Sequence, residues 1–154
     1  FIADGHHLPP ATLRCMLRAK GTARSLLVTD AIELAGMPPG RYLRRGLEAE
    51  LTPEGKVALV GSPYLAGSVA TMPQLVAHAV RDGGLSFVEA VRLVTLQPEL
   101  LMGRHVRPWA CEVGVSANFA EVEWSPAEAV LRVRTVVNGR FASQGSGATA
   151  RTLL

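Results

Sequence analysis

The order of apolar and polar positions predicts strands and helices in alternation at the start of the chain. Residues 1–3 and 25–28 are short apolar runs, which are typical of strands buried on both faces of a parallel sheet. Between them, a segment that opens with Pro9-Pro10 and closes at Gly21 carries an apolar stripe at helical spacing, as expected for a surface helix. The pattern indicates a βαβ unit.

Turn and capping residues organise the middle of the chain. Residues 42–60 alternate weakly around a Pro/Gly turn and predict a small hairpin. Thr71 and Ser86 each stand three residues before a Gln or Glu, a spacing that favours helix starts. We therefore expect one helix from Thr71 to about Arg81, and a second from Ser86 to Pro98.

Past Gly103 the periodicity changes from helical to alternating. Residues 121–124 and 131–137 alternate apolar with polar side chains, which predicts antiparallel strands with one wet face. Asn138-Gly139 is a turn signal after the second run. The sequence thus predicts an α/β layer followed by a small β module.

The composition fits a buried α/β core. The chain has 154 residues, 48% of them hydrophobic and 5% aromatic, with a mean hydropathy of +0.21. This apolar surplus suits either helix-covered parallel strands or a piece of a larger core, and an opening at Phe1 instead of Met favours the piece. Uncharged apolar runs are too short to predict a membrane span, and no signal-peptide pattern is visible.

The charge distribution limits the kinds of binding partner, and the cysteines indicate the cellular compartment. The net charge is +3, and the local arginine cluster, Arg41, Arg44 and Arg45, has no interleaved aromatics, which argues against nucleic-acid binding. These arginines are interpreted as a solvated face or as contacts to an anionic small molecule. Cys15 and Cys111 are interpreted as free buried thiols of a cytoplasmic protein instead of a disulfide.

Candidate chemistry follows the two apolar runs. Asp4-Gly5-His6-His7 follows the first run and Asp30 follows the second, where the carboxyl ends of parallel strands line a shared edge. A carboxylate there needs a partner if it is buried, so Asp30 either caps a turn or serves a site. Neighbouring strand residues point to opposite faces, so one histidine can enter the site while the other packs.

The remaining histidines, Cys15 and the common nucleophile motifs give weaker evidence of a catalytic site. From the residues alone, a structural or solvent-exposed position is favoured for His6 and His7, and also for His78, in a predicted helix, and His105, in a linker. Cys15 is interpreted as a core residue. The sequence has neither the Gly-x-Ser-x-Gly nucleophile turn nor the phosphate loop with its Gly-Lys ending.

Several motifs in a fixed order resemble a known family. They are Ile2-Ala3-Asp4-Gly5 with His7, Leu27-Val28-Thr29-Asp30-Ala31, Leu65-Ala66-Gly67-Ser68 with Thr71-Met72, and Ala90-Val91-Arg92-Leu93 with Thr95-Leu96 and Pro98. In this order they resemble the C-terminal half of the N-acetylglucosamine-6-phosphate deacetylases, of the amidohydrolase superfamily. A fainter similarity continues through residues 114–119 and 136–139.

The resemblance implies a fold and a division of the chain. The fold class is α/β, the C-terminal portion of a (β/α)8 TIM-type barrel plus returning strands of a small β-sandwich. Residues 1–103 are expected to form the last strands and helices of the barrel, and residues 104–142 the sandwich strands. The Gly/Ser/Ala-rich residues 143–154 are expected to be a disordered tail.

The resemblance also implies site residues. Asp30 matches the catalytic aspartate, which takes a proton from metal-bound water and returns it to the leaving amine. His7 matches a substrate-contacting histidine, and Leu65, Ala66 and Gly67 match the segment lining the sugar pocket. The cofactor is a divalent metal, zinc or similar, whose Glu and His ligands come from earlier strands outside this chain.

The implied function is deacetylation of N-acetylglucosamine 6-phosphate to glucosamine 6-phosphate and acetate. The expected partners are a phosphorylated amino sugar and, in the full-length protein, further copies in a homo-oligomer; nucleic acid and membrane are not expected. Without metal ligands, the chain alone is expected to be inactive. Two alternatives remain open: an amidohydrolase for another N-acyl or cyclic amide substrate, since residues 104–109 depart from the family pattern, and a non-catalytic remnant.

Overall fold

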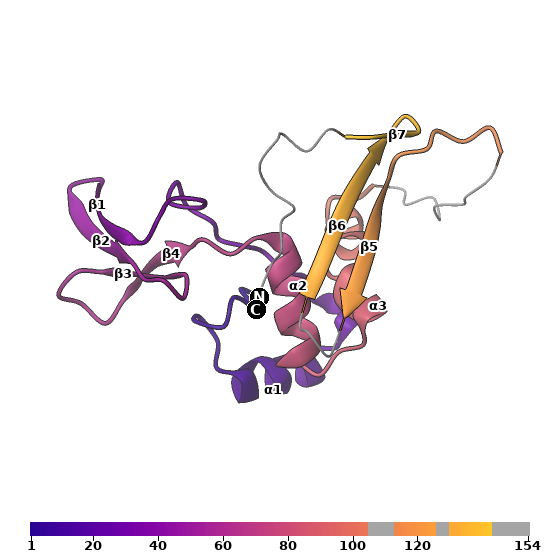
Figure 1. Ribbon diagram of the computed structural model, residues 1–154. Coiled ribbons are helices and arrows are strands. Elements are labelled where there is room, and N and C mark those ends of the chain that lie inside the picture. Colours follow the sequence, from indigo (N-terminus) through magenta and orange to yellow (C-terminus); the bar gives the residue numbers. More distant parts are fainter. Residues whose placement is uncertain (105–112, 126–129, 143–154) are drawn as a thin grey trace. The chain divides into compact units, whose positions relative to one another are not determined.

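The computed structural model describes residues 1–104, 113–125 and 130–142, in two compact units, Phe1–Pro98 and Glu99–Leu154. The first unit contains α1 (Pro10–Lys20), η1 (Thr22–Arg24), β1 (Gly40–Arg44), β2 (Leu47–Leu51), β3 (Lys56–Leu59), β4 (Leu65–Ser68), α2 (Met72–Arg81) and α3 (Phe87–Arg92) (Figure 1). Helix α4 (Leu96–Leu101) crosses the boundary, and β5 (Phe119–Ser125), β6 (Val130–Val137) and β7 (Arg140–Phe141) lie in the second unit. Within the described ranges, every helix is too short or too polar to cross a bilayer.

Helix α1 confirms the helix predicted between the two prolines and Gly21. Its buried side chains are Leu13 and Leu17, one turn apart on one face. Cys15 is exposed, so the interpretation of this residue as part of the core is wrong. It lies two residues from each buried leucine, which places it on the opposite side of the helix. Cys111 lies outside the described residues.

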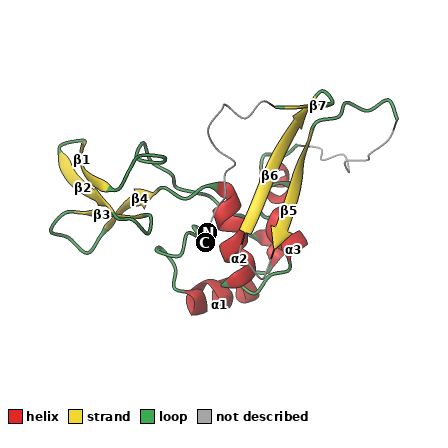
Figure 2. Ribbon diagram, in the orientation of Figure 1, coloured by secondary structure: helices red, strands yellow, loops and turns green. Residues whose placement is uncertain are grey.

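The two apolar runs, residues 1–3 and 25–28, lie side by side without forming the predicted strands. The Phe1 nitrogen donates a hydrogen bond to the Leu26 carbonyl oxygen over 2.7 Å, and the Val28 amide donates to the Phe1 carbonyl oxygen over 3.0 Å. This is the slanted bonding of a parallel pair. A β-strand needs several consecutive residue pairs along the ladder, whereas these two bonds define a single pair. The two runs therefore lack strand structure and appear as loops in Figure 2.

The predicted hairpin is part of a larger antiparallel sheet with the order β1-β2-β3-β4. The turn between β2 and β3 lies where the Pro/Gly signal placed it, closed by a 3.0 Å hydrogen bond from Gly55 to the Thr52 carbonyl. A further turn, not predicted from the sequence, lies at Arg45-Gly46, where both residues have positive φ, as a tight hairpin turn requires. Buried side chains pack together in this part of the chain: Leu34, Ala49, Leu51 and Val57.

Both predicted capping boxes are confirmed. The Thr71 amide donates to Gln74 Oε1 over 2.7 Å, and the Ser86 amide donates to Glu89 Oε2 over 2.8 Å. Each pair satisfies amide hydrogens that the first turn of a helix leaves without partners. The starts of α2 and α3 are therefore encoded locally.

The predicted end of the second helix is wrong, because α3 stops at Arg92 and α4 begins at Leu96. The Leu93 amide approaches the carbonyls of both Glu89 and Ala90 at 3.2 Å, and the next amide, at Val94, donates to the carbonyl three residues back. Such tightening to a three-residue spacing is common where helices end.

In the second unit, β5, β6 and β7 form an antiparallel sheet, which confirms the predicted strands. Cross-strand ion pairs join its side chains, with Arg132 Nη1 3.1 Å from Glu123 Oε2. The Asn138-Gly139 turn has φ values of 50° and 76°, as the sequence indicates. Residues 105–112 and 143–154, including His105 and the predicted tail, lie outside the described residues.

Strand β4 approaches the segment after Asp30 at Gly67. A Cβ on Gly67 would lie 2.5 Å from Ile32 Cγ2, and φ at Gly67 is +128°. We predict that Gly67→Ala destabilises the protein through both the clash and the backbone strain. Gly46→Ala is the matched control, because Gly46 also has a positive φ, +82°, but nothing within 4 Å of its Cβ position.

The control substitution should cost roughly 1–2 kcal/mol from backbone strain, and Gly67→Ala about 1–3 kcal/mol more from overpacking. Urea unfolding of both variants measures the difference. Equal losses would show that Ile32 moves aside freely and that β4 is not closely seated there.

Candidate functional site

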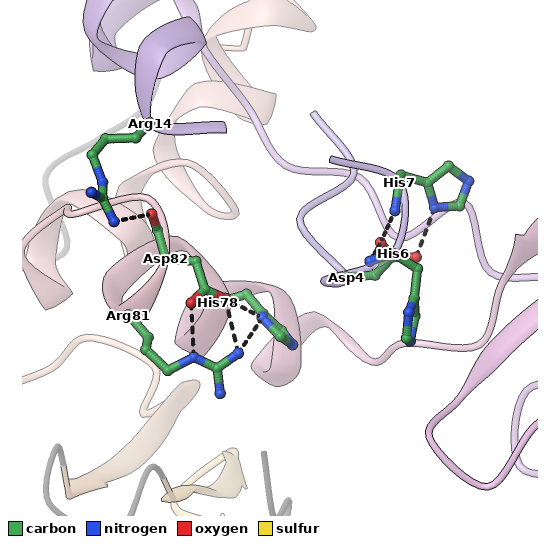
Figure 3. Close-up of polar contacts among 7 residues, drawn as sticks. All are labelled: Asp4, His6, His7, Arg14, His78, Arg81 and Asp82. Atoms are coloured by element: carbon green, nitrogen blue, oxygen red, sulfur yellow. Dashed lines mark hydrogen bonds and ion pairs between the residues drawn. The ribbon is translucent and has the colours of Figure 1, made fainter. Parts of the chain in front are cut away.

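The loop of residues 4–7 is organised by one buried carboxylate. Asp4 is 6% exposed, and its Oδ1 accepts hydrogen bonds from the backbone amides of His6 at 3.0 Å and His7 at 2.9 Å. Its Oδ2 accepts from Nδ1 of the His7 ring at 2.8 Å (Figure 3). The side chain thus folds the following backbone around itself, as Asp often does in turns.

These bonds keep Asp4 ionised. Burial by itself would raise the pKa of this carboxyl, but the hydrogen bonds from the His7 and His6 amides and from the His7 ring outweigh it and hold the pKa below its usual value. The apolar run before Asp4 therefore ends in a fixed negative charge whose hydrogen-bonding needs are met locally.

Asp4 also determines which nitrogen of His7 is free. A carboxylate can only accept hydrogen bonds, so Nδ1 of His7 must carry a hydrogen. Nε2 is then the open edge of the ring, and it lies 3.9 Å from Asp30 Oδ2. The His7 side chain is 20% exposed and that of Asp30 is 54% exposed, so both groups are accessible from solvent.

Asp30 occupies a turn that β4 holds in place. Its φ is 51°, a left-handed conformation that Asp tolerates better than most residues. The Ser68 amide donates to the Asp30 carbonyl oxygen over 3.0 Å, and the Ile32 amide donates to the Ser68 carbonyl oxygen over 2.9 Å. The backbone on each side of Ala31 is therefore fastened to the end of β4.

Three of the sequence-predicted site residues come together in the fold. His7 faces Asp30, and Gly67 lies beside the Asp30 backbone, 3.5 Å from its carbonyl oxygen at the Cβ position. The other two take places in the small sheet: Ala66 packs against its buried cluster, and Leu65 pairs with Ala58. The geometry thus singles out the pair His7–Asp30.

His6 makes a different contact from its neighbour. Its Nε2 donates to the Glu54 carbonyl oxygen over 3.1 Å, at the turn between β2 and β3. His6 therefore ties the loop to the small sheet, while His7 is the histidine whose ring approaches Asp30.

Sequence reasoning missed two residues of this region. Asp4 was recognised as polar but not as the group that holds His7; an Asp-Gly turn directly after an apolar run was the available signal. His78, for which a structural or exposed position is expected, has a side chain that is only 16% exposed and that lies against the Asp4–His7 loop at Gly5. No local pattern indicated that contact.

The described residues do not make a metal site by themselves. In residues 1–104, 113–125 and 130–142 there is no group of three or more His, Cys, Asp or Glu side chains placed to hold a metal ion. Zinc sites use three or four protein ligands, whereas His7 and Asp30 supply at most two.

Comparison with known proteins places this geometry in context, although no family model matches the chain. It is 39% identical over 104 residues to N-acetylgalactosamine-6-phosphate deacetylase of Escherichia coli O157:H7, covering 67% of this chain and 26% of the relative. It is 35% identical over 148 residues to N-acetylglucosamine-6-phosphate deacetylase of Bos taurus, covering 94% of this chain and 34% of the relative.

Solved structures agree with the sequence relatives. N-acetyl-D-glucosamine-6-phosphate deacetylase of Mycobacterium smegmatis matches with a TM-score of 0.71 at 28% identity, over 93% of this chain and 37% of that one. The chain is related to the N-acetylglucosamine-6-phosphate deacetylases. An Asp-to-Ala variant of the Mycobacterium deacetylase, in complex with N-acetyl-D-glucosamine 6-phosphate, matches over 92% of this chain and 36% of that one, with a TM-score of 0.67 at 28% identity.

The relation to these deacetylases confirms the resemblance read from the motifs. The mixed α/β fold with antiparallel sheets matches the deacetylase structures. The chain spans 60% of the length of one curated relative and between 26% and 35% of the length of seven more.

The bonding at Asp4 predicts a specific pH dependence of stability. The pKa of Asp4 is lower in the folded state than in the unfolded chain, so its contribution is present above the unfolded pKa, near 4, and is lost as the pH falls through the folded pKa. Asp4→Asn should therefore reduce the free energy of unfolding at pH 7 by roughly 1.5–3 kcal/mol, the range for hydrogen bonds to charged groups.

The check is urea unfolding of the wild type and Asp4→Asn from pH 7 down to pH 3. The stability difference between them should shrink as the wild-type carboxylate takes up its proton. A difference that stays constant over this range would contradict the role of the charge.

Proposed function

We propose that this chain carries part of the active site of a deacetylase that converts N-acetylglucosamine 6-phosphate into glucosamine 6-phosphate and acetate. The observation that carries the proposal is the approach of His7 Nε2 to Asp30 Oδ2, which lie 3.9 Å apart. The chain that brings them together is related to proteins named N-acetylglucosamine-6-phosphate deacetylase. The deacetylase variant that holds the sugar phosphate supports this substrate class.

Asp30 is the proposed general base and general acid. Hydrolysis of an acetamide needs a group that removes a proton from the attacking water, and the sugar amine leaves well only after it is protonated. A single accessible carboxylate can take the first proton and deliver it to the amine. The 54% exposure of the Asp30 side chain suits this shuttle, and the hydrogen bond from Ser68 to the Asp30 carbonyl oxygen holds the backbone from which the carboxylate extends.

His7 is the proposed substrate contact. With Nδ1 donating to Asp4, the ring is fixed in one orientation and offers Nε2 to a polar group of the sugar or of its acetamide. We place the sugar pocket along Leu65, Ala66 and Gly67, because the end of β4 is bonded to the Asp30 segment.

The proposal also covers the barrel and sandwich parts of the fold, the metal cofactor and the state of the full-length protein. We propose that residues 1–103 are the last strands and helices of a (β/α)8 barrel and residues 104–142 part of a β-sandwich; the parallel pairing of Phe1 beside residues 26–28 supports the first assignment. We propose a divalent metal, zinc or similar, as the cofactor, bound mainly by residues outside this chain. We expect a cytoplasmic homo-oligomer at full length.

The galactosamine epimer is a second candidate substrate. It is raised by the 39% identity over 104 residues to an N-acetylgalactosamine-6-phosphate deacetylase, which is similar to the 38% identity over 120 residues to the N-acetylglucosamine-6-phosphate deacetylase of Danio rerio. Both sugars present the same acetamide to Asp30. Acetate release from each sugar phosphate, compared as kcat/KM, decides between them.

We predict that Asp30→Asn, in the protein at the length its gene encodes, lowers kcat by roughly 10²–10⁴-fold, the usual contribution of a general acid–base group. Stability should change little because the side chain is half exposed. The measurement is acetate release from N-acetylglucosamine 6-phosphate. Glu33→Gln is the matched control, since Glu33 is a similarly exposed carboxylate, 58%, paired with Arg44, and should keep wild-type turnover. Turnover of Asp30→Asn within a few-fold of wild type would remove Asp30 from this role.

His7 and His6 provide a second comparison. His7→Asn should raise KM or lower kcat about tenfold or more, because the ring edge facing Asp30 is lost. His6→Asn should have a much smaller effect, since its ring bonds to Glu54 in the small sheet. Steady-state kinetics of both variants provide the test, and a larger loss at His6 would mean that the two histidines have been assigned the wrong way round.

A further inference from the structure

The ring of His78, on α2, lies against the loop that carries His7. A Cβ on Gly5 would lie 2.9 Å from His78 Cε1, 3.4 Å from Nε2 and 3.5 Å from Nδ1, so the ring occupies the space where a side chain at residue 5 would begin. Gly5 also has a φ of +81°, which favours glycine. The loop between Asp4 and His6 therefore rests on an imidazole ring.

That ring is held by an ion pair at the end of α2. His78 Nδ1 lies 2.7 Å from Asp82 Oδ2, and Arg81 donates to both oxygens of the same carboxylate, each over 2.9 Å (Figure 3). Because the carboxylate only accepts, Nδ1 of His78 carries the hydrogen. Arg81 Nη2 is also 2.8 Å from Nδ1, but with both groups as donors this approach follows from their shared acceptor.

The C-terminal end of α2, which carries His78, Arg81 and Asp82, is hydrogen-bonded to α1. Arg14 Nη2 donates to the Asp82 carbonyl oxygen over 3.1 Å. The next residue, Gly83, is buried, and a Cβ there would lie 2.9 Å from Leu17 Cδ1. The end of α2 thus has a defined position relative to the helix that follows the His7 loop.

We propose that His78 is a positioning residue for His7: its ring, oriented by Asp82 and Arg81, supports Gly5 and thereby places His7 Nε2 opposite Asp30. The proposal rests on the proposed function for its kinetic readout. A displacement of about 1 Å at a reacting group can lower a rate by roughly 10²-fold. His78 acts through the loop at Gly5 and not through a direct bond to His7 or Asp30.

Kinetics of variants test the proposal in the protein at the length its gene encodes. His78→Ala should lower kcat for N-acetylglucosamine 6-phosphate by about 10- to 100-fold, and His78→Gln, whose amide can still bond to Asp82, should recover part of it. Val76→Ala is the control, because it removes buried volume from the same helix without removing a polar contact. It should lower Tm but leave kcat per folded molecule unchanged. Equal kcat for His78→Ala and Val76→Ala would overturn the proposal.

A double-mutant cycle tests the contact itself. Gly5→Ala should lower kcat, because the new methyl group meets the ring, and adding His78→Ala should remove that clash. The double variant should therefore be at least about threefold more active than the product of the two single losses predicts. Strict multiplicativity would mean that the ring and the loop are not coupled.

The nitrogen resonances of the His7 ring separate this inference from the proposed function. In the wild type, NMR should show a hydrogen on Nδ1 of His7 bonded to Asp4. His78→Ala should shift or broaden that signal, whereas Val76→Ala should not. If the wild type releases no acetate, the proposed function fails and these signals alone decide: a shift supports the positioning role, and unchanged signals overturn it.

Discussion

The buried carboxylate of Asp4 is the interaction on which the candidate site depends. A charge in this position is tolerated only when its oxygens are satisfied, and here two backbone amides and one imidazole nitrogen satisfy them. Because the donors are His6 and His7 themselves, meeting that need also shapes the loop and selects the free nitrogen of His7. The hydrogen bonds to one buried charge therefore connect the end of an apolar run to the orientation of the His7 ring.

The two aspartates of the site differ in surroundings and hence in proposed role. The Asp4 side chain is 2% exposed and committed to its neighbours, so it positions His7. The Asp30 side chain is 54% exposed, and its place comes from backbone bonds to β4, which leaves the carboxylate available for proton transfer. His7 connects them, bonded to the first and facing the second. The two residues are of the same type, so the difference in their proposed roles comes from their different burial and hydrogen bonding.

Local patterns predicted the features that a few neighbouring residues determine. The capping boxes at Thr71 and Ser86 and the turn at Asn138-Gly139 were foreseen because each needs only nearby donors or a positive φ. The strands predicted over residues 1–3 and 25–28 are not present, because a strand depends on partners elsewhere in a sheet and not on its own sequence alone. Asp30 and His7 are proposed as site residues from their place after apolar runs and from the resemblance. The Gly5–His78 contact joins distant segments, and spacing cannot reveal it.

We propose that Asp4 holds His7 so that the His7 Nε2 atom meets the substrate beside Asp30. The most direct measurement is NMR of the His7 ring nitrogens in the Asp30→Asn protein, at its encoded length, during titration with N-acetylglucosamine 6-phosphate. We expect the Nε2 resonance to shift as the site saturates, while the hydrogen on Nδ1 stays bonded to Asp4. An unchanged His7 ring in a protein that calorimetry shows to bind the sugar phosphate would contradict it.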